Sequence, residues 1–147
     1  MFFYLVTPLI LITSSSLGLL INPSWSISPF IWVFILVPII DLVLPYLNKQ
    51  DVDLKENVLH NFSILIILPC ILFLIVFGLI VVSDSTISIM VAAALGAAVG
   101  MSGGSIGITT AHELIHRQNK YMRGIGVLLL VLCCYGHFRI EHVYGHH

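Results

Sequence analysis

The chain has 147 residues, of which 59 % are apolar and only 9 % charged, and its formal net charge is −1. Soluble domains carry roughly 25 % charged residues, so this chain has too little charge for a water-facing surface. A net charge this close to zero also provides no basic surface for nucleic acid. The composition predicts an all-α polytopic membrane protein.

Four apolar stretches have about the 20 residues that a helix needs to cross a bilayer. They are Phe2–Ile21, Phe30–Leu47, Val58–Val82 and Ile89–Thr110. The first has no basic residue ahead of it and polar residues in its middle, so we expect a span rather than a cleaved signal peptide. Pro69 lies inside the third stretch, where neighbouring helices can satisfy the carbonyl that it frees. The prediction is a helical bundle with about four spans.

Basic residues predict the topology. Lys49 and Lys55 follow the second stretch, and three more basic residues follow the fourth: Arg117, Lys120 and Arg123. Basic residues mark cytoplasmic loops, so both regions and the N-terminus are expected in the cytoplasm. We interpret the three later residues as anchors at the membrane surface.

A further apolar run, Gly124–Phe138, has 15 residues and is short for a span. It predicts a re-entrant or interfacial helix. A helix that does not cross the membrane leaves the segments before and after it on the same face. That matters because both of these segments contain histidines.

Glycines recur every four residues in the fourth stretch, at Gly96, Gly100 and Gly104. Small residues at this spacing let helix backbones approach closely. Continued at the same spacing, the stripe passes Ile108 and reaches His112. The sequence therefore predicts a tightly packed seam that leads toward this histidine, although plain helix packing explains the glycines equally well.

Two histidine clusters flank the short apolar run. They consist of His112 and His116 on one side, and His142, His146 and His147 on the other. Histidines four residues apart on a helix can bind one ion together, and nitrogen ligands suit Fe, Cu, Zn or Ni. The cysteines, Cys70, Cys133 and Cys134, lie in apolar stretches and are expected to be packing residues.

Other polar residues are candidates for supporting roles. Glu113 and Glu141 each precede a histidine and are expected to orient a ligating imidazole. Asp41, inside the second stretch, is a functional candidate because charge within a membrane is costly; it either orients a ligand, pairs with Arg139 or reaches the cytoplasmic surface. Two further histidines remain open. His60 is interpreted as interfacial or as a sixth ligand, and His137 as a support or core residue.

Two enzyme classes use such residues. His112-Glu113-Leu114-Ile115-His116 matches the H-E-x-x-H pattern of zinc proteases, in which the glutamate is the general base. That reading leaves most of the second cluster unexplained. A histidine-rich di-iron oxygenase, which needs about eight ligands, would use both clusters.

The residues resemble the membrane alkane 1-monooxygenase family, within the integral-membrane fatty acid desaturase/hydroxylase group. The resemblance is carried by Thr109–Arg117 (TTAHELIHR) and Tyr135–His147 (YGHFRIEHVYGHH). It is specific over Gly100–His147 and only general before that. Arg117 stands where many members have lysine, and Val143-Tyr144 where others have Asn-Arg, so the substrate range stays open.

The resemblance implies a set of five iron ligands, namely His112, His116, His142, His146 and His147. It implies two non-haem iron ions on the cytoplasmic side and O₂-dependent hydroxylation of the terminal carbon of n-alkanes, with fatty acyl chains as alternative substrates. Rubredoxin would supply the electrons and an NADH-dependent reductase would recharge it. Trp32, Phe34 and the glycine stripe are candidate walls of an alkyl channel.

The family has a further H-x-x-H-H cluster downstream that this sequence lacks. We therefore expect residues 1–147 to be one membrane domain that forms the N-terminal part of a longer domain. If His147 is the true end, the iron ligand set is incomplete, and the expected alternative is an inactive, truncated membrane protein that binds metal.

Overall fold

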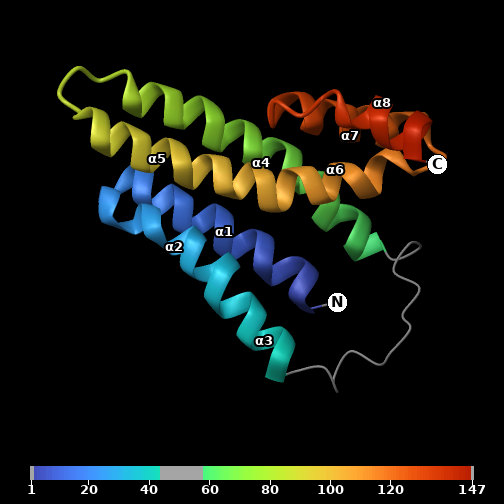
Figure 1. The fold of residues 1–147 in the computed structure, drawn as a ribbon, viewed down its shortest axis with the longest axis horizontal. Coiled ribbons are helices and arrows are strands. Elements are labelled where there is room, and N and C mark those ends of the chain that lie inside the picture. The colour runs from blue at the N-terminus through green and yellow to red at the C-terminus, as the bar shows by residue number, and fades with distance from the viewer. Residues whose placement is uncertain (1, 44–57, 147) are drawn as a thin grey trace.

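A computed structural model of the chain describes residues 2–43 and 58–146 (Figure 1). This part of the chain is helical and contains no strand. Its α-helices are α1 (Phe2–Leu20), α2 (Ser28–Ile31), α3 (Val37–Val43), α4 (Val58–Val82), α5 (Ile89–Ser102), α6 (Ile108–Ile115), α7 (Lys120–Leu132) and α8 (Phe138–Ile140). Short 3₁₀ or π-helical segments join several of them: Pro23–Ile27, Trp32–Leu36, Gly103–Gly107 and Glu141–His146.

Three helical rods are long and apolar enough to cross a membrane: Pro23–Val43, His60–Val82 and Ile89–Ile115. The apolar helix Val6–Leu20 within α1 is shorter. The predicted all-α membrane architecture is confirmed, and the four predicted stretches fall on α1 and these three rods. The end of the second stretch, residues 44–47, and the loop with Lys49 and Lys55 lie outside the described residues.

Two predicted boundaries were wrong. The second rod begins at Pro23 rather than Phe30, because the Asn22 side chain accepts a hydrogen bond from the Ser24 backbone N–H (2.9 Å) and proline suits a first helical turn. The fourth helix continues through the polar residues to Ile115 rather than ending at Thr110. Backbone hydrogen bonding carries a helix through polar side chains until another signal ends it.

A buried polar contact joins α1 to α5. Ser15 and Ser102, which are 1 % and 0 % exposed, have their hydroxyl oxygens 2.7 Å apart. One hydroxyl donates to the other, and the accepting hydroxyl can then donate to a carbonyl of the neighbouring helix: Ser102 to Leu11 (3.4 Å) or Ser15 to Ala98 (3.3 Å). Hydrogen bonds of serine hydroxyls across neighbouring membrane helices stabilise the packing of one helix against the other.

Replacing Ser15 by alanine is expected to lower the free energy of unfolding by about 1 kcal/mol, because the Ser102 hydroxyl loses a buried partner. Reversible unfolding in mixed detergent micelles measures this change. Thr13→Ala is the matched control, since Thr13 is exposed and donates only to carbonyls of its own helix, Leu9 and Ile10. Equal effects of the two substitutions would contradict the role given to the Ser15–Ser102 contact.

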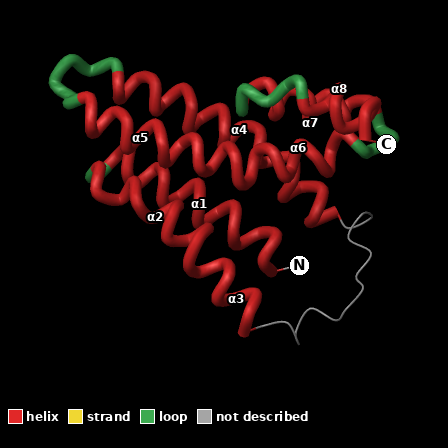
Figure 2. The backbone as a smooth tube through the Cα atoms, in the orientation of Figure 1, coloured by secondary structure: helices red, strands yellow, loops and turns green. Residues whose placement is uncertain are grey.

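The segment after α6 folds back as a helical hairpin. The Asn119 side chain caps α7, accepting hydrogen bonds from the backbone N–H groups of Tyr121 (2.9 Å) and Met122 (3.4 Å). Helix α7 then runs back along α6, and the chain turns at Cys134 (φ 55°) and returns through α8 (Figures 1 and 2).

The 13 residues of α7 span about 20 Å, less than the roughly 30 Å of a bilayer core. In the hairpin, α8 and the following segment come back to the end of α6. The two histidine segments therefore meet at one end of the bundle, as expected if α7 does not cross the membrane.

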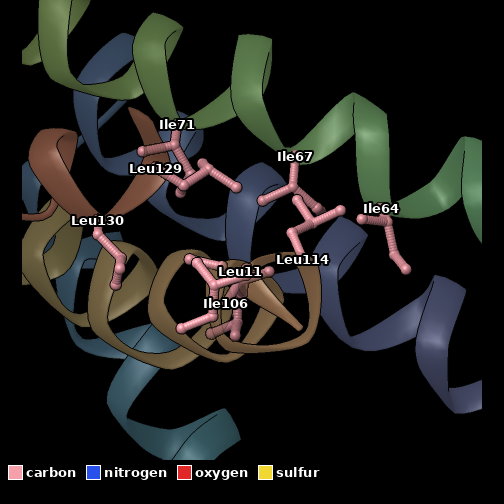
Figure 3. Packing of buried hydrophobic residues seen from close by; sticks show 10 residues of the cluster. Leu11, Ile64, Ile67, Ile71, Ile106, Leu114, Leu129 and Leu130 are labelled. Atoms are coloured by element: carbon pink, nitrogen blue, oxygen red, sulfur yellow. The ribbon is translucent and has the colours of Figure 1, made fainter. Parts of the chain in front are cut away.

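The core lies where α1, α4, α6 and α7 meet. Its buried residues include Leu11, Ile64, Ile67, Ile71, Ile106, Leu114, Leu129 and Leu130 (Figure 3). Leu11, Leu114, Leu129 and Leu130 are almost completely buried. This core seats α6 between α4 and α7, and α6 carries the first histidine cluster.

The prediction of a tight glycine seam was wrong. A Cβ atom added at Gly96, Gly100 or Gly104 would meet nothing within 4 Å. The close approaches occur at two other glycines: a Cβ at Gly107 would lie 2.6 Å from Cys133 Sγ, and one at Gly126 would lie 2.7 Å from Leu114 Cβ. A regular spacing of small residues identifies an open face of a helix but not whether another helix covers it.

Candidate metal centre

Three predicted ligands come together at the end of α6. The Nε2 atoms of His112 and His142 are 2.7 Å apart, those of His116 and His142 are 3.0 Å apart, and those of His112 and His116 are 3.3 Å apart. His112 and His116 lie one helical turn apart, with His112 in the last turn of α6 and His116 as its C-cap. His142 belongs to the π-helical segment Glu141–His146.

These distances suit three nitrogen ligands on one ion. An imidazole nitrogen lies about 2.1 Å from its metal, so two ligands at right angles are about 3.0 Å apart, and two at the tetrahedral angle about 3.4 Å. The observed separations are 2.7 to 3.3 Å, so only small shifts of the rings are needed to bring all three nitrogens onto one ion. A single hydrogen bond can satisfy one pair of these atoms, whereas one ion accepts lone pairs from all three.

An aromatic stack positions His142. The Phe138 ring lies nearly parallel to that of His142, with centroids 4.8 Å apart and planes at 12°, and the Tyr135 ring stacks on that of Phe138 with centroids 5.3 Å apart. Phe138 also meets the edge of His112 at 5.8 Å. Phe138 precedes His142 by four residues, and this helical spacing was the signal in the sequence that could have revealed it.

The other predicted ligands and acids either do not belong to this cluster of three histidines or fall outside the described residues. The side chain of His146 and the whole of His147 are outside the described residues. Glu141 is exposed at the start of the segment that carries His142, and Asp41 is exposed on α3, well separated from α8 in Figure 1. His137 is also exposed, with its ring edge-on to Tyr135 at 4.7 Å. The cluster of three is thus formed by His112, His116 and His142.

Glu113 binds a residue that the sequence suggested to be interfacial. His60 Nε2 donates to Glu113 Oε1 (2.9 Å), and the Arg117 guanidinium donates to the same oxygen (2.6 Å). His60 lies in the first turns of α4 and is 5 % exposed, so its side chain is buried within the protein. Arg117, interpreted as a surface anchor, is part of an ion pair. His60 and Glu113 are 53 positions apart, and this long separation hid their contact from sequence patterns.

The paired cysteines pack as expected. Cys133 Sγ donates to the Gly103 carbonyl (3.4 Å) and lies beside Gly107. Burial, and secondarily the neighbouring Cys134, raises the pKa of the Cys133 thiol. A raised pKa disfavours the thiolate that binds metals. The group of three side chains that could hold a metal among the described residues contains histidines alone.

Comparisons with known proteins identify similar sequences. Alkane 1-monooxygenase 2 of Pseudomonas aeruginosa is 51 % identical over 49 residues, which are 33 % of this chain and 13 % of that protein. The alkane 1-monooxygenase of Acinetobacter baylyi is 47 % identical over 53 residues, 36 % of this chain and 13 % of that protein. Alkane 1-monooxygenase 1 of Alcanivorax borkumensis is 38 % identical over 66 residues, 45 % and 16 % of the two chains.

The similarity is local. It spans about an eighth of the length of the first of these relatives, and no family model and no solved structure matches the chain. Several relatives named for the same activity nevertheless agree over about a third of the chain. The resemblance to the membrane alkane 1-monooxygenase family that the histidine motifs predict is therefore confirmed over that part of the chain.

Proposed function

We propose that this chain forms part of a membrane-bound alkane hydroxylase and contributes histidine ligands to its non-haem di-iron centre. The observation that carries the proposal is the convergence of three imidazole nitrogens within 3.3 Å of one another in a chain similar to alkane 1-monooxygenases. His112, His116 and His142 would hold an iron ion, with His146 and His147 adding ligands from the second cluster. The remaining ligands would come from beyond these 147 residues.

The proposed reaction inserts one atom of O₂ into the terminal C–H bond of an n-alkane and reduces the other atom to water. Two electrons and two protons complete the balance, and rubredoxin, recharged by an NADH-dependent reductase, would deliver the electrons. The iron centre supplies the oxidising power that an unactivated C–H bond requires. The protein residues hold the metal, exclude water and orient the chain end.

Walls for an alkyl chain are present on the open glycine face. Gly100 and Gly104 border an apolar cavity of about 230 Å³ between α4, α5 and the α7–α8 turn, and Gly96 borders another of about 170 Å³. Ile75 and Val99 line both cavities. Of the other expected wall residues, Trp32 is partly buried against the core, while Phe34 is 64 % exposed. We therefore place the alkyl chain along the glycine face.

The zinc protease is the second candidate, and the site favours it less. A protease general base must offer an oxygen to a metal-bound water, and Glu113 has only Oε2 for this role, because its Oε1 accepts hydrogen bonds from His60 and Arg117. The relatives are also named as monooxygenases. We further propose that the site faces the cytoplasm of a bacterial inner membrane, where a soluble electron donor can reach it.

The complete protein that contains this segment tests the proposal. Membranes supplied with ¹⁸O₂, NADH, rubredoxin and its reductase are expected to convert an n-alkane to the 1-alcohol carrying one ¹⁸O atom, with iron bound to the protein. His142→Ala is expected to lose both product and iron. One zinc per chain together with peptide cleavage that Glu113→Gln abolishes would instead establish the protease.

A further inference from the structure

The first histidine cluster lies on an exposed side of α6, whereas another side of this helix packs closely against α7. His112 and His116 are exposed, so burial does not fix their rings. His116 is the C-cap of α6, where the final backbone carbonyls of a helix lack partners within the helix and the last turn tends to fray. The positions of both imidazoles therefore depend on what holds the last turn of α6.

Apolar contacts hold one side of that turn. Ala111, Leu114 and Ile115 are buried, and Gly126 of α7 lies close against them. This packing sets the distance between α6 and α7, and a contact on another side of α6 can fix the rotation of the helix about its own axis. The polar residue between His112 and Leu114 is Glu113, which projects about 100° around the helix from His112.

Glu113 accepts hydrogen bonds from Arg117 and His60, and only His60 belongs to another helix. Arg117 lies on the same stretch of chain, four residues later, and so its ion pair cannot fix α6 relative to another helix. His60 comes from α4, and its Nε2–H donates to Glu113 Oε1 from a position that is 5 % exposed. The donor is buried and the acceptor is a carboxylate that is 34 % exposed. A hydrogen bond to a charged oxygen is directional and is stronger than one between neutral groups.

We infer that His60 is a positioning residue and not a metal ligand, an inference that rests on the proposed metal centre. Its bond to Glu113 ties the last turn of α6 to α4 and so aims His112 and His116 at His142. Residues that support metal ligands in this way typically change metal affinity by 10- to 100-fold when they are replaced.

Co(II) titration of the full 147-residue chain in detergent micelles tests this role, with the visible d–d bands reporting ligand geometry. His60→Ala is expected to weaken Co(II) binding about 10- to 100-fold and to change the band intensities. His60→Gln, whose amide N–H can take the place of Nε2–H, is expected to recover most of the affinity. Ser63→Ala is the matched control, because Ser63 is buried one turn further along α4 and its hydroxyl donates to the His60 carbonyl.

The double variant His60→Ala/Glu113→Ala makes the test specific. If His60 acts through Glu113, the double variant binds Co(II) as the Glu113→Ala variant does, because the second change removes nothing more. Additive losses, or an equal loss in His60→Ala and His60→Gln, would make His60 an independent ligand and overturn the inference. Unchanged affinity in His60→Ala would also overturn it, while absence of Co(II) binding by the unaltered chain would overturn the proposed metal centre as well.

Discussion

Replacing His142 by alanine is expected to lower the affinity of the chain for Co(II) about a hundredfold or more. The three Nε2 atoms of His112, His116 and His142 converge within 3.3 Å, so each supplies a full share of the binding energy. A four-ligand structural zinc site gains roughly 10–16 kcal/mol, or roughly 3 kcal/mol for each ligand. Loss of one ligand from a three-histidine group should cost at least as much.

Titration with Co(II), followed by its d–d absorption, measures this loss, and circular dichroism checks that the helices remain. His137→Ala is the matched control: His137 precedes His142 by five residues, is exposed and touches Tyr135. Equal affinities of the unaltered chain and the His142→Ala variant would remove His142 from the site. A comparable loss of Co(II) affinity in the His137→Ala control would mean that the binding depends on the fold of the segment around His142 and not on the His142 imidazole.

The convergence of His112, His116 and His142 was the part of the candidate site that sequence patterns could predict. His112 and His116 share a helix face by their spacing alone, and the 15-residue length of Gly124–Phe138 predicted a helix that does not cross the membrane, which brings His142 back to them. Both inferences use only local geometry. They required no knowledge of which helix packs against which.

Contacts between distant segments could not be predicted in the same way. The His60–Glu113 bond joins α4 to α6 across 53 residues, and its partners have no shared periodicity. The glycine stripe misled for a related reason: its last glycine, Gly104, lies in the π-helical turn Gly103–Gly107, and a wider turn shifts the phase of every residue that follows. Tertiary packing decided that Gly107 and Gly126, and not Gly96 or Gly100, lie in tight contacts.

Replacing Gly126 by alanine is expected to lower the free energy of unfolding by about 1–3 kcal/mol. A Cβ atom at this position would lie 2.7 Å from Leu114 Cβ, 3.0 Å from the Ala111 carbonyl oxygen and 3.1 Å from the Ile115 backbone nitrogen. Two of these three atoms belong to the backbone of α6, so α7 as a whole must move away. Alanine's better helix propensity offsets only about 0.5–1 kcal/mol of the cost.

Gly124→Ala is the matched control for this prediction, because Gly124 lies on the same helix, is exposed, and has no neighbouring atom within 4 Å of the place that a Cβ would occupy. It is expected to stabilise the chain by about 0.5–1 kcal/mol, so unfolding in mixed micelles should shift in opposite directions for the two variants. Because α7 carries the hairpin that returns His142 to α6, displacement of α7 should also weaken Co(II) binding in the Gly126→Ala variant alone. Stabilisation by both substitutions would show that α7 and α6 do not pack closely at Gly126, and that the histidines are brought together by some other contact.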